Sequence, residues 1–361
     1  MSTEYLQAGM LISIFASAVR MGTIVLCAAL GELIVERSGV LNLSVEGMML
    51  TGALSGFLVG YFTNSLWLGV LCAALAGMLI SVIFALLAVV LQVDQTVSGL
   101  TVNIFAAGLT FFIYRTIFPN VGSEGTPNLV PFAALKIPYF SQIPVLGELL
   151  FSHHAMAYIA LFMVLIIWFY LYRTKSGLIL RTIGENPRAV DMKGINVTLY
   201  RVLAVLFGGL MAGLAGSVIT LASAGVFVAD ITAGRGWLAI AIVILGDWKP
   251  GKILLASLFF GFIDALQMQV QALGVKLPYQ LFLAMPYIIT VTVMWCGTAV
   301  GWYWVMKNMK LFTAGAYFSV MCIVCLACLG IFFFKERVTS LEYFGLFLAV
   351  ASVVILSRFA S

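Results

Sequence analysis

Charged residues are scarce in this sequence. They make up 9% of its 361 residues, whereas a soluble domain carries about 25%. Hydrophobic residues account for 63% of the chain. This composition excludes a soluble globular protein and predicts a polytopic membrane protein. The formal net charge of +5 comes largely from Lys and Arg in the expected inner loops, so it indicates membrane orientation rather than nucleic-acid binding.

Histidine and cysteine are also rare. The two histidines, His153 and His154, have no acid or nucleophile near them in sequence, so we expect ordinary loop histidines rather than a catalytic pair. The six cysteines lie in apolar segments, and Cys322, Cys325 and Cys328 recur every three residues. Because no His or carboxylate neighbours them, they are interpreted as small apolar filler rather than as metal ligands or disulfides.

Two familiar sequence signals are missing. The N-terminal segment MSTEYLQAGM has no basic region, so nothing marks a cleaved signal peptide and the first helix is expected to stay in the protein. The segment GDWKPGKI imitates a phosphate-binding loop, but Ile253 supplies no hydroxyl and Pro250 supplies no backbone donor. The sequence therefore predicts no nucleotide site in this chain.

Apolar runs of about 20 residues predict an all-α transmembrane bundle of about nine permease spans and about two C-terminal spans. The runs are Leu11–Leu33, Val40–Phe62, Leu66–Leu91, Val97–Ile117, Ala155–Tyr172, Val202–Leu221, Trp237–Leu245, Ile253–Leu273, Leu281–Val300, Leu311–Phe334 and Leu341–Leu356. The short run at Trp237 is interpreted as a half-span or a buried segment. Glycines spaced four apart, at Gly52, Gly56 and Gly60 and at Gly209 and Gly213, favour close helix packing within the chain over a subunit interface.

One polar island interrupts the apolar runs. Six of the nineteen Lys and Arg residues belong to it: Arg173, Lys175, Arg181, Arg188, Lys193 and Arg201. A loop this basic is expected in the cytoplasm. Asn186 suits a helix cap, Pro187 suits the first helical position and Gly194 ends the helix, so the island predicts a small helix that docks on a partner.

The other loops take their sides by parity. The long loop Pro119–His154 holds Lys136 as its one basic residue and is expected outside, where it meets an external partner. The loops at Asp94 and at Asp247–Lys252 then lie inside, and Arg235 and Lys276 fall outside.

Polar residues inside the apolar runs are the sharpest functional signal. Asp264, Gln267 and Gln271 share one helix face, and a carboxylate costs at least about 2.5 kcal/mol at mid-membrane. Such a stripe lines a substrate path or forms a structural pair that locks two helices, and the residues alone leave both interpretations open. Asn42, Glu46 and Asn103 are similar cases, and Asn42 lies where a helix is expected to break.

Several segments carry a resemblance to a known family. They are ERSGVLNLSVEGMML, DQTVSGLTVNIFAAGLT, LILRTIGENPRAVDMKGINVTLYR, ADITAGRGWLAIAIVILGDWKPGKILLASLFFGFIDALQ and LPYQLFLAMPYIITVTV. Over about residues 9–297 the chain resembles the permease subunits of bacterial ABC importers of the branched-chain amino acid and ribose class, most of all the nucleoside-type branch.

That resemblance implies an importer subunit of the bacterial inner (cytoplasmic) membrane that is not itself an enzyme and holds no cofactor. ATP and Mg²⁺ would be used by a separate ATPase subunit. The other implied partners are a second permease, identical or different, and a periplasmic or lipoprotein substrate-binding protein. The implied coupling residues are Glu185, Asn186, Pro187, Arg188, Asp191 and Lys193. The implied path residues are Asn42, Glu46, Asn103, Asp264, Gln267 and Gln271.

The end of the chain departs from that family, which divides the protein into residues 1–300 and 301–361. The second part resembles the later half of a small multidrug resistance transporter of the drug/metabolite superfamily, without the first helix and its glutamate. We expect a structural remnant there. The alternative function is a proton-coupled secondary transporter using Asp264, or a drug-efflux unit, and the predicted docking helix favours the ATP-driven importer.

Overall fold

The computed structural model describes residues 3–119, 126–136, 147 and 151–272. Three predicted spans, Leu281–Val300, Leu311–Phe334 and Leu341–Leu356, lie outside the described residues. So do the cysteine series at Cys322 and the whole of the tail from residue 301.

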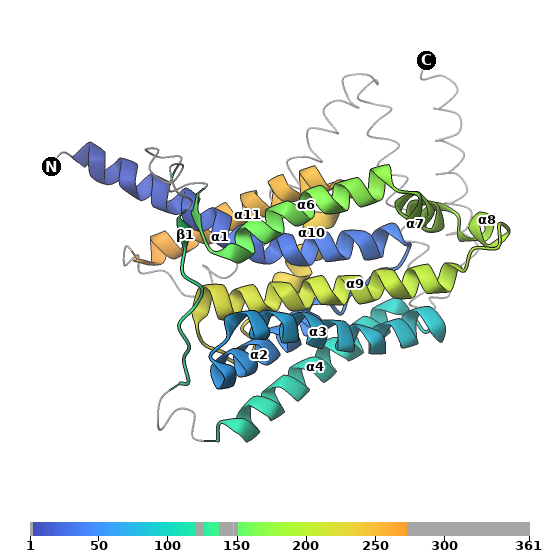
Figure 1. Cartoon of the computed structure of the whole chain (residues 1–361), viewed down its shortest axis with the longest axis horizontal. Coiled ribbons are helices and arrows are strands. Elements are labelled where there is room, and N and C mark those ends of the chain that lie inside the picture. The colour runs from blue at the N-terminus through green and yellow to red at the C-terminus, as the bar shows by residue number, and fades with distance from the viewer. Residues whose placement is uncertain (1–2, 120–125, 137–146, 148–150, 273–361) are drawn as a thin grey trace, which may run out of the picture. The chain divides into compact units, whose positions relative to one another are not determined.

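The described chain is helical (Figure 1). Its helices are α1 (Thr3–Arg37), α2 (Val45–Thr63), α3 (Leu66–Phe84), α4 (Gln95–Ile117), α6 (Ala155–Arg173), α7 (Lys175–Glu185), α8 (Pro187–Asp191), α9 (Val197–Ser217), α10 (Arg235–Leu245) and α11 (Pro250–Ala272). Two π-helical segments, η1 (Ala85–Val90) and η3 (Val218–Ala224), continue α3 and α9. Two short antiparallel strands, β1 (Leu135–Lys136) and β2 (Ser152–His153), pair in the long loop.

Within the described residues, seven helices are long and apolar enough to cross a membrane. They coincide with seven of the predicted runs, so the all-α prediction is confirmed there apart from the two short strands. The run at Trp237 forms α10, an 11-residue helix about 16 Å long, which is too short to cross a bilayer core of about 30 Å. The helix is short and six of its residues are buried, as the prediction of a half-span or a buried segment requires.

Helix α9 lies in the middle of the bundle, between α1 on one side and α2 and α3 on the other (Figure 1). The predicted glycine packing brings these backbones together. A Cβ added to Gly52 would lie 2.5 Å from the Cα of Gly213, and one added to Gly77 would lie 2.4 Å from the carbonyl oxygen of Gly209. Only glycine fits at such approaches, which explains these positions by packing within the chain.

Polar caps start the helices at the end of the bundle that is predicted to face the cytoplasm. The Asp94 carboxylate accepts from the amide of Val97 at 2.9 Å, and the Asn196 side chain accepts from the amide of Leu199 at 2.9 Å. Each cap satisfies an amide that has no partner within its own helix. The caps therefore fix where α4 and α9 begin.

Between α9 and α10 the chain turns back into the bundle. After η3, residues at the outer end bond to the long loop, where the amide of Leu129 donates to the carbonyl of Gly225 at 2.8 Å. The chain then runs to the first turn of α2, where α10 begins, and α10 continues to the end of α1, where Trp248 meets Arg37. Helix α10 is therefore a half-helix that begins inside the bundle, and with the non-helical segment before it the chain passes from the outer end of the bundle to the inner end.

Candidate functional site

The start of α10 is held by an acidic side chain from α2. The Glu46 carboxylate accepts hydrogen bonds from the amides of Gly234 and Gly236, at 2.8 and 2.6 Å. Free amides and the positive end of the helix dipole make a helix N-terminus a natural anion site, and here the anion belongs to the protein. Gly236 has to be glycine, because a Cβ would lie 2.5 Å from the backbone nitrogen of Glu46.

A pair of opposite charges lies beside this cap. The guanidinium of Arg235 is 3.7 Å from the Asp264 carboxylate, and the two side chains are 27% and 15% exposed. Asp264 lies about 21 Å along α11 from Pro250, inside a bilayer core of about 30 Å. The sequence analysis placed Arg235 in an outer loop because it counted whole spans, whereas the chain runs into the bundle before α10 begins and places Arg235 against Asp264.

Asn103 of α4 clamps the beginning of α2. Its side-chain oxygen accepts from the amide of Gly47 at 2.8 Å, and its side-chain nitrogen donates to the carbonyl of Leu43 at 2.7 Å. Both ends of the amide are therefore used on the backbone of the segment that carries Glu46. The clamp fixes that carboxylate in place for α10.

Asn42 forms the predicted break between α1 and α2. The side-chain oxygen of Asn42 accepts from the backbone amide and the hydroxyl of Ser44, at 3.0 and 2.5 Å. The backbone amide of Asn42 donates to the Glu32 carboxylate at 3.1 Å. Asn42 and Glu32 are buried. The break is confirmed, and Asn42 bonds to neighbouring residues there, while the second carboxylate oxygen of Glu32 is buried without a hydrogen-bond partner.

The path residues therefore separate into two groups. Glu46, Asn103, Arg235 and Asp264, which we call the polar cluster, meet around the first turns of α2 and α10. Gln267 and Gln271 are half-buried on α11 beyond Asp264. Arg235 is the residue that sequence reasoning missed, and its signal was present in the GRGW segment, where a charge follows a glycine just before the short apolar run.

At the cytoplasmic end, α8 confirms the predicted local structure of the docking helix. The Asn186 side chain accepts from the amide of Ala189 at 3.1 Å, Pro187 begins the helix, and Gly194 has a positive φ of 75°. The helix ends at Asp191, slightly earlier than expected. The side chains exposed around it include Glu185, Asn186, Arg188, Asp191, Met192 and Lys193.

Residues 36–39, at the end of α1, connect this region to the other inner loops. The Trp248 indole nitrogen donates to the Glu36 carboxylate, and Arg37 donates to the carbonyl of Trp248 at 2.9 Å. Arg201 donates to the carbonyl of Ser38 at 3.2 Å. These bonds place the loop at residues 246–252 at the same end as the basic island, as parity predicts.

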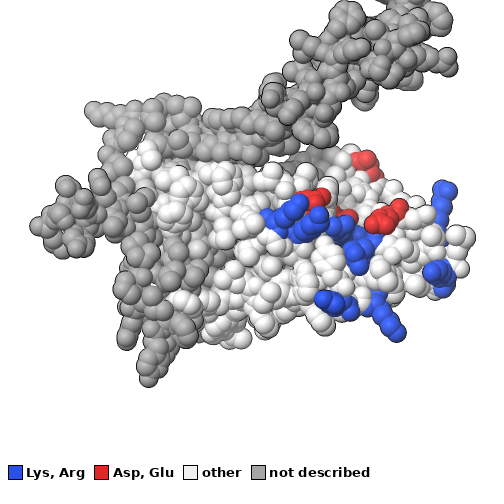
Figure 2. All heavy atoms as spheres, turned by 90° about the horizontal axis from the view of Figure 1, so that it is seen from above, with Lys and Arg blue, Asp and Glu red and all other residues white. Residues whose placement is uncertain are grey.

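The charge distribution agrees with that orientation. Figure 2 shows the Lys and Arg side chains of the visible face gathered over the half of the molecule where α7 and α8 lie in Figure 1. Basic residues collect on the cytoplasmic side of membrane proteins, so the distribution fits the prediction that this end faces the cytoplasm.

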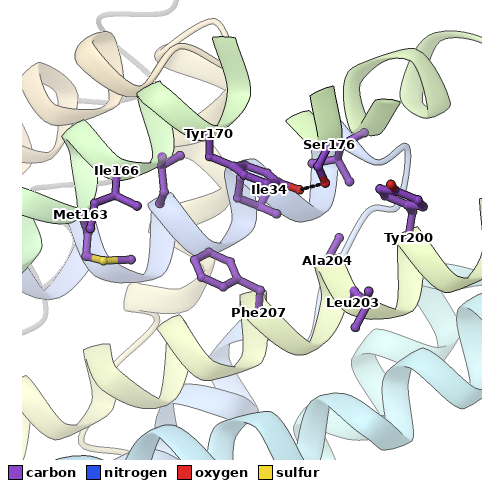
Figure 3. A pocket seen from close by; sticks show the side chains of 11 residues that line it. Ile34, Met163, Ile166, Tyr170, Ser176, Tyr200, Leu203, Ala204 and Phe207 are labelled. Carbon is purple, nitrogen blue, oxygen red and sulfur yellow. Dashed lines mark hydrogen bonds between the residues drawn. The ribbon is translucent and has the colours of Figure 1, made fainter. Parts of the chain in front are cut away.

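An apolar cavity of ≈ 320 Å³ lies between α1, α6, α7 and α9 (Figure 3). Ile34, Ile166 and Phe207 contribute to its wall, and the Tyr170 and Ser176 hydroxyls are bonded to each other at 3.1 Å. Such a lining offers little polar recognition to a hydroxyl-rich substrate, so the polar cluster is the better candidate for a substrate path.

The two histidines are buried at the start of α6. The Nδ1 atom of His154 accepts from the amide of Ala157 at 3.2 Å and caps α6. Burial, followed by the nearby His153 and Arg20, lowers the pKa of His154 to about 4. The expectation of ordinary loop histidines is wrong in one respect, because both rings are buried.

A multi-pass bundle with a half-helix that begins inside it and an intramembrane polar cluster is typical of a membrane transport subunit. Residues 13–294 match the family described as the permease component of branched-chain amino acid transport systems. The chain belongs to this family of ABC transporter permeases, which are non-catalytic membrane subunits without a cofactor.

Named relatives support the same assignment. A putative glucose ABC transporter permease of Haloferax volcanii, TsgC13, is 39% identical over 72% of this chain and 78% of its own length. The guanosine ABC transporter permease NupQ of Bacillus subtilis is 38% identical over 73% of this chain and 85% of its own. The nucleoside permease NupC of Lactococcus lactis is 33% identical over 78% and 90%. No solved structure matches the chain.

The family match ends before the tail. It stops at residue 294, so the resemblance of residues 301–361 to a small multidrug resistance transporter finds no support in it. The division of the chain at residue 300 stays a prediction.

Proposed function

We propose that this chain is a permease subunit of an ATP-driven nucleoside importer in the cytoplasmic membrane. The similarity to permeases named for guanosine and for nucleosides carries the substrate class. Sugar import is the second candidate, because the relative from Haloferax volcanii is named for glucose. Because that relative is archaeal, we assign the chain to a cytoplasmic membrane and leave open whether the organism is a bacterium or an archaeon.

The polar cluster is the proposed place where substrate passes. A nucleoside carries hydroxyls and ring nitrogens, which need donors and acceptors in a site otherwise lined by apolar groups. Among the described residues, the Nε atom of Arg235 and the hydroxyl of Thr232 are buried without a hydrogen-bond partner. These unused groups, of which Arg235 lies beside Asp264, support a substrate contact at the start of α10, with Gln267 and Gln271 further along the path.

Asn42, Glu46 and Asn103 are proposed as the supporting shell of that path. Each of them bonds to backbone or neighbouring side chains, and together they fix where α2 and α10 begin. Their role is to hold Arg235 and Asp264 in position rather than to bind substrate directly.

Helix α8 and its flanks are the proposed coupling element that docks on the ATPase subunit. Its charged side chains are exposed, and its cap is complete without any partner. Movement of the ATPase would act on α8 and alternate the access of the path to the two sides. The binding protein would deliver substrate at the outer loops.

A second permease completes the proposed assembly. Bacillus subtilis has two guanosine permeases, NupP and NupQ, which are respectively 29% and 38% identical to this chain. This pairing favours a partner that differs from this chain. The proton-coupled alternative has less support, because the family consists of ABC permeases and Asp264 is paired with Arg235.

Uptake by the full assembly tests the proposal. The chain would be expressed with its ATPase, partner permease and binding protein in cells that lack nucleoside uptake, and accumulation of labelled guanosine and glucose would be compared. We expect ATP-dependent guanosine uptake that excess nucleoside, but not glucose, abolishes. Glucose uptake without nucleoside uptake would select the sugar candidate, and accumulation driven by a pH gradient without ATP would contradict both.

A further inference from the structure

The loop between α10 and α11 has an unusual backbone. We call residues 246–252 the Trp248 loop. Asp247 and Trp248 both have positive φ, at 53° and 50°, although neither is glycine. Two successive side-chain-bearing residues in the left-handed region cost free energy, and such a shape persists when the surroundings hold it in place.

Residues at the end of α1 provide that hold. The Trp248 indole donates to Glu36, and the Trp248 carbonyl accepts from Arg37 at 2.9 Å. Both bonds link positions more than 200 residues apart in the chain. The side chain and the backbone of one residue are thus both fixed, so the loop presents a defined surface rather than a loose connection.

The same end of α1 also supports the α7–α8 region. A Cβ on Gly184, next to α8, would lie 2.5 Å from the carbonyl oxygen of Arg37, and one on Gly39 would lie 3.2 Å from the Cα of Gly184. Arg37 therefore touches the Trp248 loop with its side chain and the α7 end with its backbone. The Trp248 loop and the end of α7 therefore both contact the end of α1.

The outward side of the Trp248 loop carries a small charged cluster. The Asp247 carboxylate accepts from the ammonium groups of Lys249 and Lys252, at 2.8 and 3.0 Å, and all three side chains are about half exposed, at 54%, 53% and 54%. These hydrogen bonds lower the pKa of Asp247 to about 2, so the carboxylate stays ionised in the cell. Lys252 lies in the first turn of α11, where the helix dipole disfavours a cation.

We propose that the Trp248 loop is a second contact of the permease with its ATPase subunit, forming one docking platform with α8. The inference rests on the proposed docking of α8. Mixed charge favours a protein partner, because an anionic lipid surface is met by clusters of Lys and Arg, and here Asp247 offsets one of the two lysines. The shared support at residues 36–39 makes the loop continuous with the α8 surface.

Charge reversal tests the contact. The double variant Lys249→Glu, Lys252→Glu, in the full assembly in nanodiscs of zwitterionic lipid, is expected to bind purified ATPase about five- to tenfold more weakly, with faster dissociation. Arg115→Glu, an exposed charge reversal at the outer end of α4, is the matched control. The variant Lys249→Arg, Lys252→Arg keeps the charges and is expected to keep the affinity.

A structural readout separates a contact from a general loss of fold. Carbodiimide cross-linking with mass spectrometry should join Lys249 or Lys252 to acidic residues of the ATPase in the wild-type assembly. Trp248→Phe keeps an aromatic side chain but loses the indole N–H that bonds to Glu36, and it should lower the yield of those cross-links while the thermal melting of the permease changes little.

The two proposals fail in different ways. If Arg188→Glu weakens binding of the ATPase and the double lysine variant does not, the Trp248 loop does not contact the ATPase and the docking of α8 stands. If Arg188→Glu has no effect while cross-links form at the loop, the assignment of α8 fails. A lysine effect that appears in anionic nanodiscs and disappears in zwitterionic ones would assign the loop to lipid headgroups and overturn the proposal.

Discussion

The polar cluster and the cytoplasmic end of this protein both carry charge, but they handle it differently. In the cluster, the Glu46 carboxylate accepts hydrogen bonds from two backbone amides, and the Asp264 carboxylate lies beside the Arg235 guanidinium. At the cytoplasmic end, Arg188, Asp191 and Lys193 point outward from a helix whose cap is already complete. Intramembrane charges have to be satisfied within the chain because lipid offers no partner, whereas exposed ones stay available to another protein.

The comparison predicts that Glu46→Ala has the largest effect. The amides of Gly234 and Gly236 would lose their acceptor, at about 1–3 kcal/mol for each buried group. We expect uptake to fall to background and the melting temperature of the purified protein to drop. Glu46→Gln retains one acceptor oxygen and should lose less. Glu185→Gln, an exposed control for stability, should keep the wild-type melting temperature, and a stable, active Glu46→Ala protein would refute the cap.

Asp264→Asn should have the next largest effect. It leaves Arg235 without its carboxylate while keeping the shape of the side chain, and we expect uptake to fall about fivefold with a smaller loss of folded protein. Initial rates of nucleoside uptake, normalised to the folded permease, measure this.

The double variant Arg235→Gln, Asp264→Asn sharpens that result. It removes both charges, so recovery of folding without recovery of uptake supports a role in the path. Recovery of both would show that the pair only locks α10 to α11.

Charge reversal on α8 should be milder. Arg188 and Asp191 are exposed, so Arg188→Glu or Asp191→Lys should change the free energy of unfolding by no more than about 0.5 kcal/mol. We expect about threefold slower uptake and a matching loss of substrate-stimulated ATP hydrolysis. Unchanged uptake and hydrolysis in both variants would remove the docking assignment.

The smallest effect on transport is expected from pH at His154. Its folded pKa is about 4, below the usual value near 6.5, so the unfolded chain binds the proton first as the pH falls. Stability is then complete above about pH 6.5 and declines toward pH 4, by at most about 2 kcal/mol at pH 5. His154→Asn keeps a cap for the amide of Ala157 and should flatten the dependence of melting temperature on pH.

Local signals in the sequence predicted local structure well. Asn186, Pro187 and Gly194 act on neighbours within a few residues, so their order in the chain was enough to predict α8. The glycine spacing at Gly52 and Gly213 predicted close helix packing, because small residues on one face have few other uses in lipid.

Contacts between distant segments were not accessible in this way. Glu46 reaches amides 188 and 190 positions away, and a carboxylate in an apolar run shows only that some partner exists. Arg235 was placed in an outer loop because a count of whole spans cannot detect a segment that runs into the bundle before its helix begins. The bonds of Trp248 to Glu36 and Arg37 were missed because they too join segments far apart in the chain.

The close backbone approach of α9 to α2 and α3 also bears on how motion in this protein is measured. Where Gly52 meets Gly213 there is no side chain to rearrange, so we expect these helices to move as one piece. Spin labels at the exposed ends of α2 and α9, Thr63 and Thr198, should keep a constant separation through the transport cycle. A label at Lys252, referred to that fixed pair, would then report the displacement of α11 in absolute terms.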